Sequence, residues 1–216
     1  MSIYKSYAVF GLGRYGSAVA QELVNNGAEV LAVDVSESLV NSASAFLPYC
    51  KCADVTDPEV IKQLGISSFD TVIVAMAKSV ESSVMAIMLC KEAGVKNVIV
   101  KCADEMHRKI FMKVGADKVV FPETESGMRL AKNLLSSGFV DVIDLSDDVS
   151  IIELDVKAEW VGKTLIELNL RRKYGLNVVA VKTNGTTNID IDPSEKLGSD
   201  MKLVVIMNKD KAKKLR

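Results

Sequence analysis

The sequence predicts an α/β fold in which a doubly wound parallel sheet is followed by a small α+β domain. Short segments rich in Val and Ile alternate with helical patterns over the first 135 residues, at about the spacing of a β-α repeat. After the Ser-Ser-Gly segment at 136–138 this alternation stops, and strand patterns prevail with one short helix among them. We therefore expect two domains, 1–135 and 136–216.

Strand and helix signals in the first domain support this organisation. Asp57 is a candidate helix N-cap because Pro58 follows it at the first helical position, and Gly94 and Gly115 stand where helices should end. Six segments carry the apolar pattern of strands: Ala8–Phe10, Glu29–Val33, Tyr49–Cys52, Thr71–Ala75, Val98–Lys101 and Val119–Phe121. Strands separated by helices in this way are typical of a parallel, doubly wound sheet.

The second domain carries a different set of elements. Strands are expected at Val149–Val156, Val178–Lys182 and Leu203–Met207, with a short helix over Thr164–Leu168. The dipeptide at 184–185 is Asn-Gly, which predicts a turn between the last two strands because both residue types accept positive φ.

Composition limits the kinds of partner that the chain can have. The 216 residues are 49% hydrophobic and carry a net charge of −1, so no long-range attraction to a nucleic-acid polymer or an anionic membrane is expected. No apolar run approaches the length of a membrane helix or a signal peptide, which predicts a cytoplasmic protein. The four cysteines and one histidine lack zinc-ligand spacing, so we expect reduced cysteines that pack as small apolar residues.

Three glycines predict a nucleotide site. Gly11, Gly13 and Gly16 form a G-x-G-x-x-G motif between the first expected strand and a helix, the context that a Rossmann-type loop requires. Gly11 permits a tight turn, Gly13 leaves room for a phosphate, and Gly16 lets the helix approach the sheet. Free N–H groups at the helix N-terminus attract anions. Asp34 ends the second strand, where its carboxylate can accept hydrogen bonds from both ribose hydroxyls and would repel a 2′-phosphate.

Other residues at the carboxyl ends of the strands are expected to line the same site, because ligands of open α/β sheets bind there. Asp54 and Val55 follow the third strand, and we expect them to face an adenine ring. Ala75, Met76 and Ala77 follow the fourth strand, where the small alanines would leave space for ribose and phosphates.

Arg14 distinguishes this loop from a minimal dinucleotide loop. A guanidinium at the helix N-terminus suits a terminal phosphate, and the alternative is that Arg14 pairs with an acidic neighbour. We include Tyr15, the next residue, among the expected ligand contacts. Lys101 ends the fifth strand and Glu123 follows the sixth, and each is either a ligand contact or half of a charge pair at the rim.

No catalytic constellation accompanies this site. The second domain has no histidine, no tyrosine has a lysine four positions later, and His107 is expected to be a surface or packing residue. The Gly-Lys-Thr at 162–164 fails as a P-loop because Lys157 occupies the position of the first glycine. We therefore expect a nucleotide sensor that is not an enzyme. The alternatives are an NAD(H)-dependent oxidoreductase and an NAD(H)-responsive sensor.

Several motifs resemble the RCK family, the regulators of potassium conductance. They are FGLGRYG with its downstream Asp34, ADVTDPEVIKQLGI, TVIVAM, VKCADEMHRKIFMKVGADKVVFPE, DLSDDVSIIEL and LNLRRKYGLNVVAVK. The likeness covers essentially the whole chain, and one nucleotide-binding half with one small C-terminal half is similar to the branch that gates bacterial Ktr transporters. The resemblance implies a homodimer that assembles into an octameric ring, attached peripherally to an integral-membrane, potassium-translocating subunit.

The resemblance also implies ligands for both domains. The N-terminal domain would bind ATP or ADP, with Arg14 approaching the γ-phosphate and Glu123 reaching it from a neighbouring subunit, in some relatives with a cation; Mg²⁺ at the phosphates stays open. The C-terminal domain would bind cyclic di-AMP through Ile166, Asn169, Arg171, Val178, Val179 and Pro193. Thr183 departs from the histidine of some relatives, and the alternative for this segment is a capped helix leading into a strand.

Overall fold

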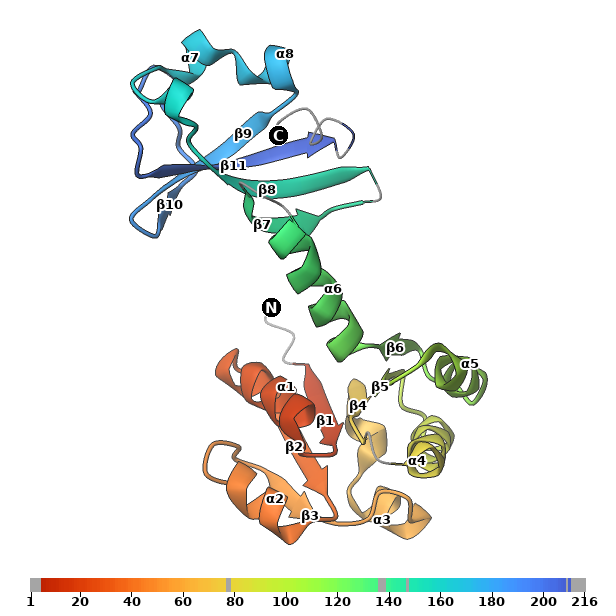
Figure 1. The fold of residues 1–216 in the computed structure, drawn as a ribbon. Helices are drawn as coiled ribbons and strands as arrows, with labels where there is room; N and C mark the ends of the chain where they lie inside the picture. Colours follow the sequence, from red (N-terminus) through yellow and green to blue (C-terminus); the bar gives the residue numbers. More distant parts are fainter. Residues whose placement is uncertain (1–4, 77–78, 136–138, 147, 209, 211–216) are drawn as a thin grey trace. The chain divides into compact units, whose positions relative to one another are not determined.

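The computed structural model describes residues 5–76, 79–135, 139–146, 148–208 and 210 (Figure 1). It contains two compact units, Met1–Glu125 and Ser126–Arg216. The division between them falls inside helix α6 (Pro122–Leu135). We expected the domain boundary after residue 135, where α6 ends, and that boundary stays a prediction.

A six-stranded parallel sheet forms the centre of the first unit. Its order, β3-β2-β1-β4-β5-β6, places β2 and β4 on either side of β1, so the winding direction reverses between β1 and β4. The strands are β1 (Ser6–Phe10), β2 (Glu29–Asp34), β3 (Cys50–Cys52), β4 (Thr71–Val74), β5 (Asn97–Lys101) and β6 (Lys118–Val120). All six predicted strands are present within one or two residues, and the Rossmann-type fold is confirmed.

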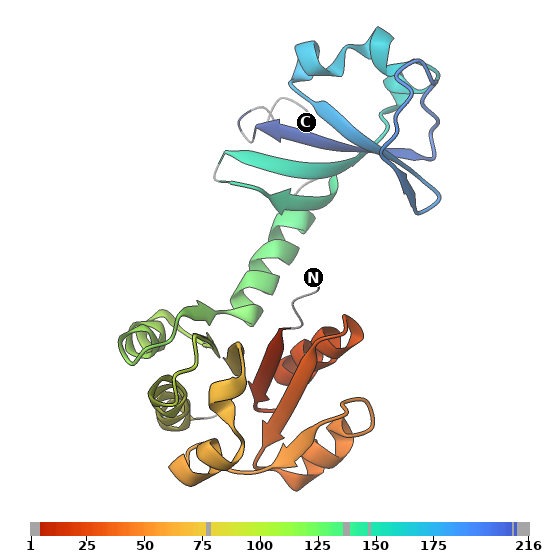
Figure 2. The ribbon, with the colours of Figure 1, turned by 180° about the vertical axis from the view of Figure 1, so that it is seen from behind.

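Helices cover both faces of this sheet (Figure 2). They are α1 (Arg14–Asn25), α2 (Glu37–Ala43), α3 (Pro58–Gln63), α4 (Val80–Glu92) and α5 (Glu105–Lys113), with a 3-10 turn η1 (Ile66–Ser68). Asp57 caps α3 as predicted, since its carboxylate accepts a hydrogen bond from the Glu59 N–H at 2.8 Å. Gly94 and Gly115 follow α4 and α5 with φ of 85° and 113°, values that favour glycine.

The side chains of β1 point alternately to the two faces of the sheet, and each face has its own buried apolar cluster. Ala8 and Phe10 pack in one buried cluster with residues of α3, α4 and α5, whereas Val9 packs in another with residues of α1 and α2. Because successive side chains of a strand point to opposite faces, a strand that is covered on both sides carries an unbroken apolar run. β4 is the clearest case, since all four of its residues are buried.

The second unit is a five-stranded antiparallel sheet in the order β10-β9-β11-β8-β7. Its strands are β7 (Phe139–Asp144), β8 (Val149–Asp155), β9 (Asn177–Thr183), β10 (Thr186–Asn188) and β11 (Met201–Asn208), and its helical segments are η2 (Ala158–Trp160), α7 (Leu165–Leu168) and α8 (Leu170–Tyr174). The core includes Trp160, Leu203 and Val205. The predicted small α+β domain is therefore present, with two strands that were not predicted.

The Asn-Gly turn at 184–185 was predicted correctly, but the strands that it joins were not. Asn184 and Gly185 have φ of 52° and 80° and do form a turn. However, the turn joins β9 to the short strand β10 and does not lead directly to the last strand. β10 was missed because the residues of Thr186–Asn188 are polar and exposed at the sheet edge, so the segment lacks the apolar alternation by which strands are found.

Candidate nucleotide-binding site

The glycine loop lies between β1 and α1, at the switch point of the sheet. Gly11 has φ of 96° and its N–H donates a hydrogen bond to the Val33 carbonyl at 2.8 Å. A Cβ on Gly11 would lie 3.0 Å from the backbone of Ala75. Both the backbone conformation and the space therefore require glycine.

Gly16 lets α1 pack against the loop. A Cβ there would overlap the Gly11 carbonyl oxygen and lie 3.2 Å from the Ala75 Cβ. Ala75, expected to leave space for a ligand, thus lies next to Gly16 of the helix. A Cβ on Gly13, by contrast, would meet nothing within 4 Å, so this side of the loop is open for a phosphate.

Asp34 holds the glycine loop in position, a role that sequence reasoning missed. Its Oδ2 accepts a hydrogen bond from the Leu12 N–H at 2.7 Å, and its Oδ1 accepts one from the Ser36 N–H at 2.8 Å. A carboxylate has about four acceptor positions, so each oxygen can still accept a ribose hydroxyl. The ligand contact expected of Asp34 stays a prediction.

Arg14 begins α1 and its side chain is exposed. No ion pair or hydrogen bond of its guanidinium occurs within the described part of the chain, so the expected alternative of an acidic partner finds no support there. The helix start has no side-chain cap and no acidic residue in its first turn. Uncapped N–H groups and a free guanidinium together make this corner attractive to an anion.

Lys101 and Glu123 form a charge pair beside the loop. The Lys101 Nζ lies 2.6 Å from the Glu123 Oε1 and 5.7 Å from the centre of the Tyr15 ring. Donation from Lys101, and secondarily from the Glu123 backbone N–H, lowers the pKa of the Glu123 carboxyl. Burial raises the pKa of the Tyr15 hydroxyl, and the negative charges of Glu125 and Glu123 raise it further. Of the two alternatives given for Lys101 and Glu123, a ligand contact or a charge pair, the structure contains the charge pair.

The residues after β3 differ in their exposure. Asp54 is exposed, and its Oδ1 accepts hydrogen bonds from the Thr56 hydroxyl at 2.7 Å and the Thr56 N–H at 2.9 Å. These bonds lower the pKa of the Asp54 carboxyl. Val55 is only 2% exposed and belongs to the core, which argues against its expected contact with adenine, whereas the exposed Asp54 keeps its ligand contact as a prediction.

A cavity of about 410 Å³ lies across the switch point from Asp34, at the carboxyl ends of β4, β5 and β6. Met76 lines it, while Ala77 lies outside the described residues. The His107 Nδ1 lies 2.8 Å from the Asp104 Oδ2, and Asp104 also caps α5. The lining residues are Met76, Ser79, Val80, Ser83, Lys101, Cys102, Ala103, His107, Phe111, Glu123 and Thr124. Sequence reasoning missed the cavity because its walls come from loops and helices far apart in the chain.

The residues expected to bind cyclic di-AMP lie in or near the helical turns of the second unit. Ile166 is 64% exposed, and its N–H donates a hydrogen bond to the Pro193 carbonyl at 3.2 Å, so these two are adjacent. Asn169 has φ of 46° and separates α7 from α8, in which Arg171 lies. In β9 the two valines differ, since Val178 packs on the core and Val179 is exposed. The capped helix given as the alternative for this segment is present as α8.

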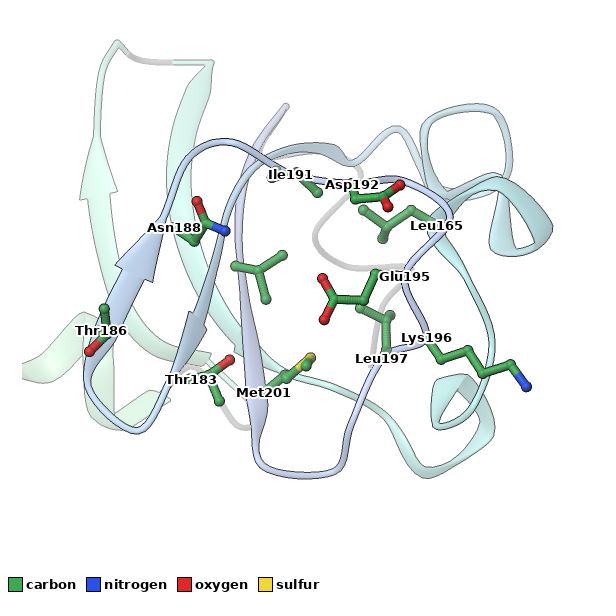
Figure 3. Close-up of a pocket in the computed structure, with 11 residues that line it drawn as sticks. Leu165, Thr183, Thr186, Asn188, Ile191, Asp192, Glu195, Lys196, Leu197 and Met201 are labelled. Carbon is green, nitrogen blue, oxygen red and sulfur yellow. The ribbon is translucent and has the colours of Figure 1, made fainter.

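A second cavity, of about 230 Å³, lies in the same unit beside these turns (Figure 3). The Glu195 carboxylate points into the hollow, whereas the Lys196 side chain points away from it (Figure 3). Apolar side chains such as Leu197 and Met201 complete the lining together with Thr183 and Asn188. None of the residues expected to bind cyclic di-AMP lines this cavity.

The described residues form neither a metal-ligand cluster nor a membrane helix. Within the described residues, no group of three or more His, Cys, Asp or Glu side chains could hold a metal ion. Across the same part of the chain, no helix combines the length and apolar character needed to span a bilayer. All four cysteines are free, and Cys90 and Cys102 are buried as predicted. The prediction that all four pack as small apolar residues is wrong for Cys52, which is exposed.

Comparison with known proteins identifies the family. Residues 7–122 match the TrkA-N domain and residues 149–216 match the TrkA-C domain. The chain is 35% identical over 202 residues to the Ktr system potassium uptake protein C of Bacillus subtilis, covering 94% of this chain and 91% of that protein. It is also 35% identical to the Ktr system potassium uptake protein A of the same organism, covering 97% and 95%. The chain belongs to the RCK family.

The RCK fold is also found among solved structures. The RCK domain of GsuK superimposes with a TM-score of 0.54 at 21% identity, covering 99% of this chain. This RCK chain spans 46% of the GsuK chain, less than half of its length. The likeness supports the two-domain RCK fold assigned here.

Proposed function

We propose that this RCK protein is the nucleotide-sensing regulatory subunit of a membrane potassium transporter. The observation that carries the proposal is Arg14, whose exposed guanidinium lies at an uncapped helix N-terminus beside the open face of Gly13. The two Ktr potassium uptake proteins that share 35% identity with this chain support a Ktr-type potassium transporter as its partner.

ATP and ADP are the proposed ligands of the first unit. Asp34 would accept the ribose hydroxyls, Asp54 would face the adenine, and Arg14 would contact the γ-phosphate. A hydrogen bond to a charged partner contributes about 1.5 to 3 kcal/mol. If Arg14 reaches only the third phosphate, ATP and ADP would differ in affinity by roughly ten- to a hundredfold. The protein binds without turnover in this proposal and is not an enzyme.

Gating would arise from assembly and membrane attachment. We propose a cytoplasmic octameric ring of dimers that attaches peripherally to the potassium-translocating subunit. A ligand shifts a two-state equilibrium only by its differential affinity for the states. A tenfold preference is worth about 1.4 kcal/mol per site, so eight sites would contribute roughly 11 kcal/mol. Mg²⁺ at the phosphates beside Glu123 and cyclic di-AMP at the second unit belong to the same proposal.

Thermal unfolding with separate ligands tests the proposal. Purified protein is heated with ATP, ADP, NADH or cyclic di-AMP, and the series is repeated with Arg14→Ala. A ligand at a hundred times its dissociation constant adds about 2.7 kcal/mol, which raises the midpoint by several degrees. We expect ATP to stabilise more than ADP in the wild type and equally in Arg14→Ala. A larger effect of NADH that is indifferent to Arg14 would refute the proposal.

An NAD(H)-binding sensor or oxidoreductase is the second candidate, favoured by the 410 Å³ cavity across the switch point from Asp34. That side of the sheet is where the second half of a dinucleotide would extend. NADH fluorescence would change on binding in this case, and an oxidoreductase would also consume NADH with a substrate. Absence of both signals would leave the ATP/ADP proposal alone.

A further inference from the structure

Two cations flank the glycine loop, and they differ in their partners. Arg14 is exposed and has no ion pair within the described residues, whereas Lys101 is already paired with Glu123 at 2.6 Å. The Lys101 ammonium also lies over the ring of Tyr15, the residue that follows Arg14. A phosphate held by the loop therefore meets one free cation and one that is neutralised.

The two side chains of the Lys101–Glu123 pair differ in their exposure to solvent. The Lys101 side chain, at the end of β5, is only 13% exposed, whereas the Glu123 side chain, at the start of α6, is 69% exposed. Glu123 can therefore rotate into solvent at little cost, while Lys101 stays in place. Both residues line the 410 Å³ cavity, so a ligand that extends from the glycine loop toward this cavity approaches them.

We propose that Glu123 occupies the position of a phosphate on Lys101, and that an unesterified terminal phosphate of the nucleotide binds Lys101 by displacing it. This inference rests on the proposed function and adds a specificity-determining pair to the site. The Glu123 carboxylate carries one negative charge, whereas a terminal phosphate group carries about 1.5 to 2 at neutral pH. The phosphates inside a dinucleotide are esterified on both sides and carry one charge each, so they compete less well.

The surrounding charges make displacement necessary. The negative charges of both Glu125 and Glu123 act on Tyr15, so two carboxylates oppose an anion near the loop while Glu123 remains in place. Lys101 also holds the pKa of Glu123 below its usual range, which keeps the carboxylate charged at neutral pH. Glu123 is therefore a true competitor of the phosphate for the same ammonium group.

A double-mutant cycle tests the pair. ATP and NADH dissociation constants are measured by calorimetry in EDTA, which removes any cation from the site, for wild type, E123Q, K101M and the double variant. We expect E123Q to bind ATP about two- to fivefold more tightly, the range given by an exposed ion pair. In the K101M background E123Q should have no effect, because the ammonium for which the carboxylate competes is gone. NADH binding should change less than ATP binding in E123Q.

A matched control and a second variant keep the result unambiguous. E105Q removes one carboxylate from the same unit, in a weaker 3.5 Å pair with Arg108, and should leave ATP binding unchanged. E123D shortens the side chain and should weaken the contact with Lys101, so it should tighten ATP binding even if E123Q proves unstable.

The results that would overturn the role of Glu123 differ from the results that would overturn the proposed function. Unchanged or weaker ATP binding by E123Q overturns the inference while leaving the proposed function intact, provided that wild-type binding depends on Arg14. Equal tightening in the K101M background also overturns it, because Glu123 would then act by simple repulsion. If neither the wild type nor E123Q binds ATP, both the proposed function and this inference are wrong.

Discussion

Substituting Asp34 by Asn should loosen the glycine loop even without a nucleotide. Each Asp34 oxygen accepts one backbone N–H, from Leu12 at 2.7 Å and from Ser36 at 2.8 Å. Asn offers one acceptor oxygen and places an NH₂ group where the other stood, so one of the two N–H groups would face another donor. Loss of one hydrogen bond to a charged acceptor costs about 1.5 to 3 kcal/mol, and we expect the lower end because Asp34 is half-buried.

Hydrogen exchange of single amides measures this effect where it arises. A local loss of about 1.4 kcal/mol corresponds to roughly tenfold faster exchange. We expect that acceleration at Leu12 or Ser36 in ligand-free Asp34→Asn. Asp54→Asn is the matched control, because the Asp54 carboxylate bonds only within its own exposed turn and should not affect these amides. Wild-type exchange at both amides, with lower nucleotide affinity alone, would refute the structural role of Asp34.

Three further predictions follow from the packing and charges of the first unit. Gly16→Ala should lower the midpoint of thermal unfolding and abolish nucleotide binding, because its Cβ would overlap a carbonyl oxygen of the loop; wild-type binding by this variant would contradict that geometry. Burial raises the pKa of Cys90 to about 12, so an alkylating reagent at neutral pH should modify the exposed Cys52 and spare Cys90, as mass spectrometry would show. The pKa of Glu123 is lowered in the folded protein, so its pairing with Lys101 stabilises the fold above the ordinary value of 4.5 and is lost as the pH falls through the lower folded value. The difference in unfolding free energy between wild type and E123Q should therefore shrink below that pH.

Elements that are buried on both sides, or that carry local capping signals, could be predicted from the sequence. The β4 run is apolar throughout because helices cover both of its faces, and Asp57-Pro58 fixes the start of α3 within the chain itself. The strands β7 and β10 were missed. β10 lies at a sheet edge, where pairing with β9 and not apolar burial defines the strand.

The candidate site also combines features that could be predicted from the sequence with features that could not. The role of Gly11 in a tight turn follows from residue spacing, and its φ of 96° agrees. The bonds from Asp34 to the loop do not follow from spacing, because they depend on how two segments that are 22 residues apart meet in space. The pairing of Lys101 with Glu123 could be named only as one of two outcomes, since position alone does not choose between a ligand and a carboxylate.

The close approach of Gly16 to Ala75 has a consequence for how such a site can evolve. These two positions, together with Gly11, form a frame in which almost any added atom meets backbone or a neighbouring Cβ. Asp34 is bonded to this frame, but Arg14 is exposed and Lys101 and Glu123 pair with each other, so substitutions at these three positions leave the frame intact. Ligand preference can therefore drift among relatives by single charge changes, while the fold that presents the ligand is inherited without alteration.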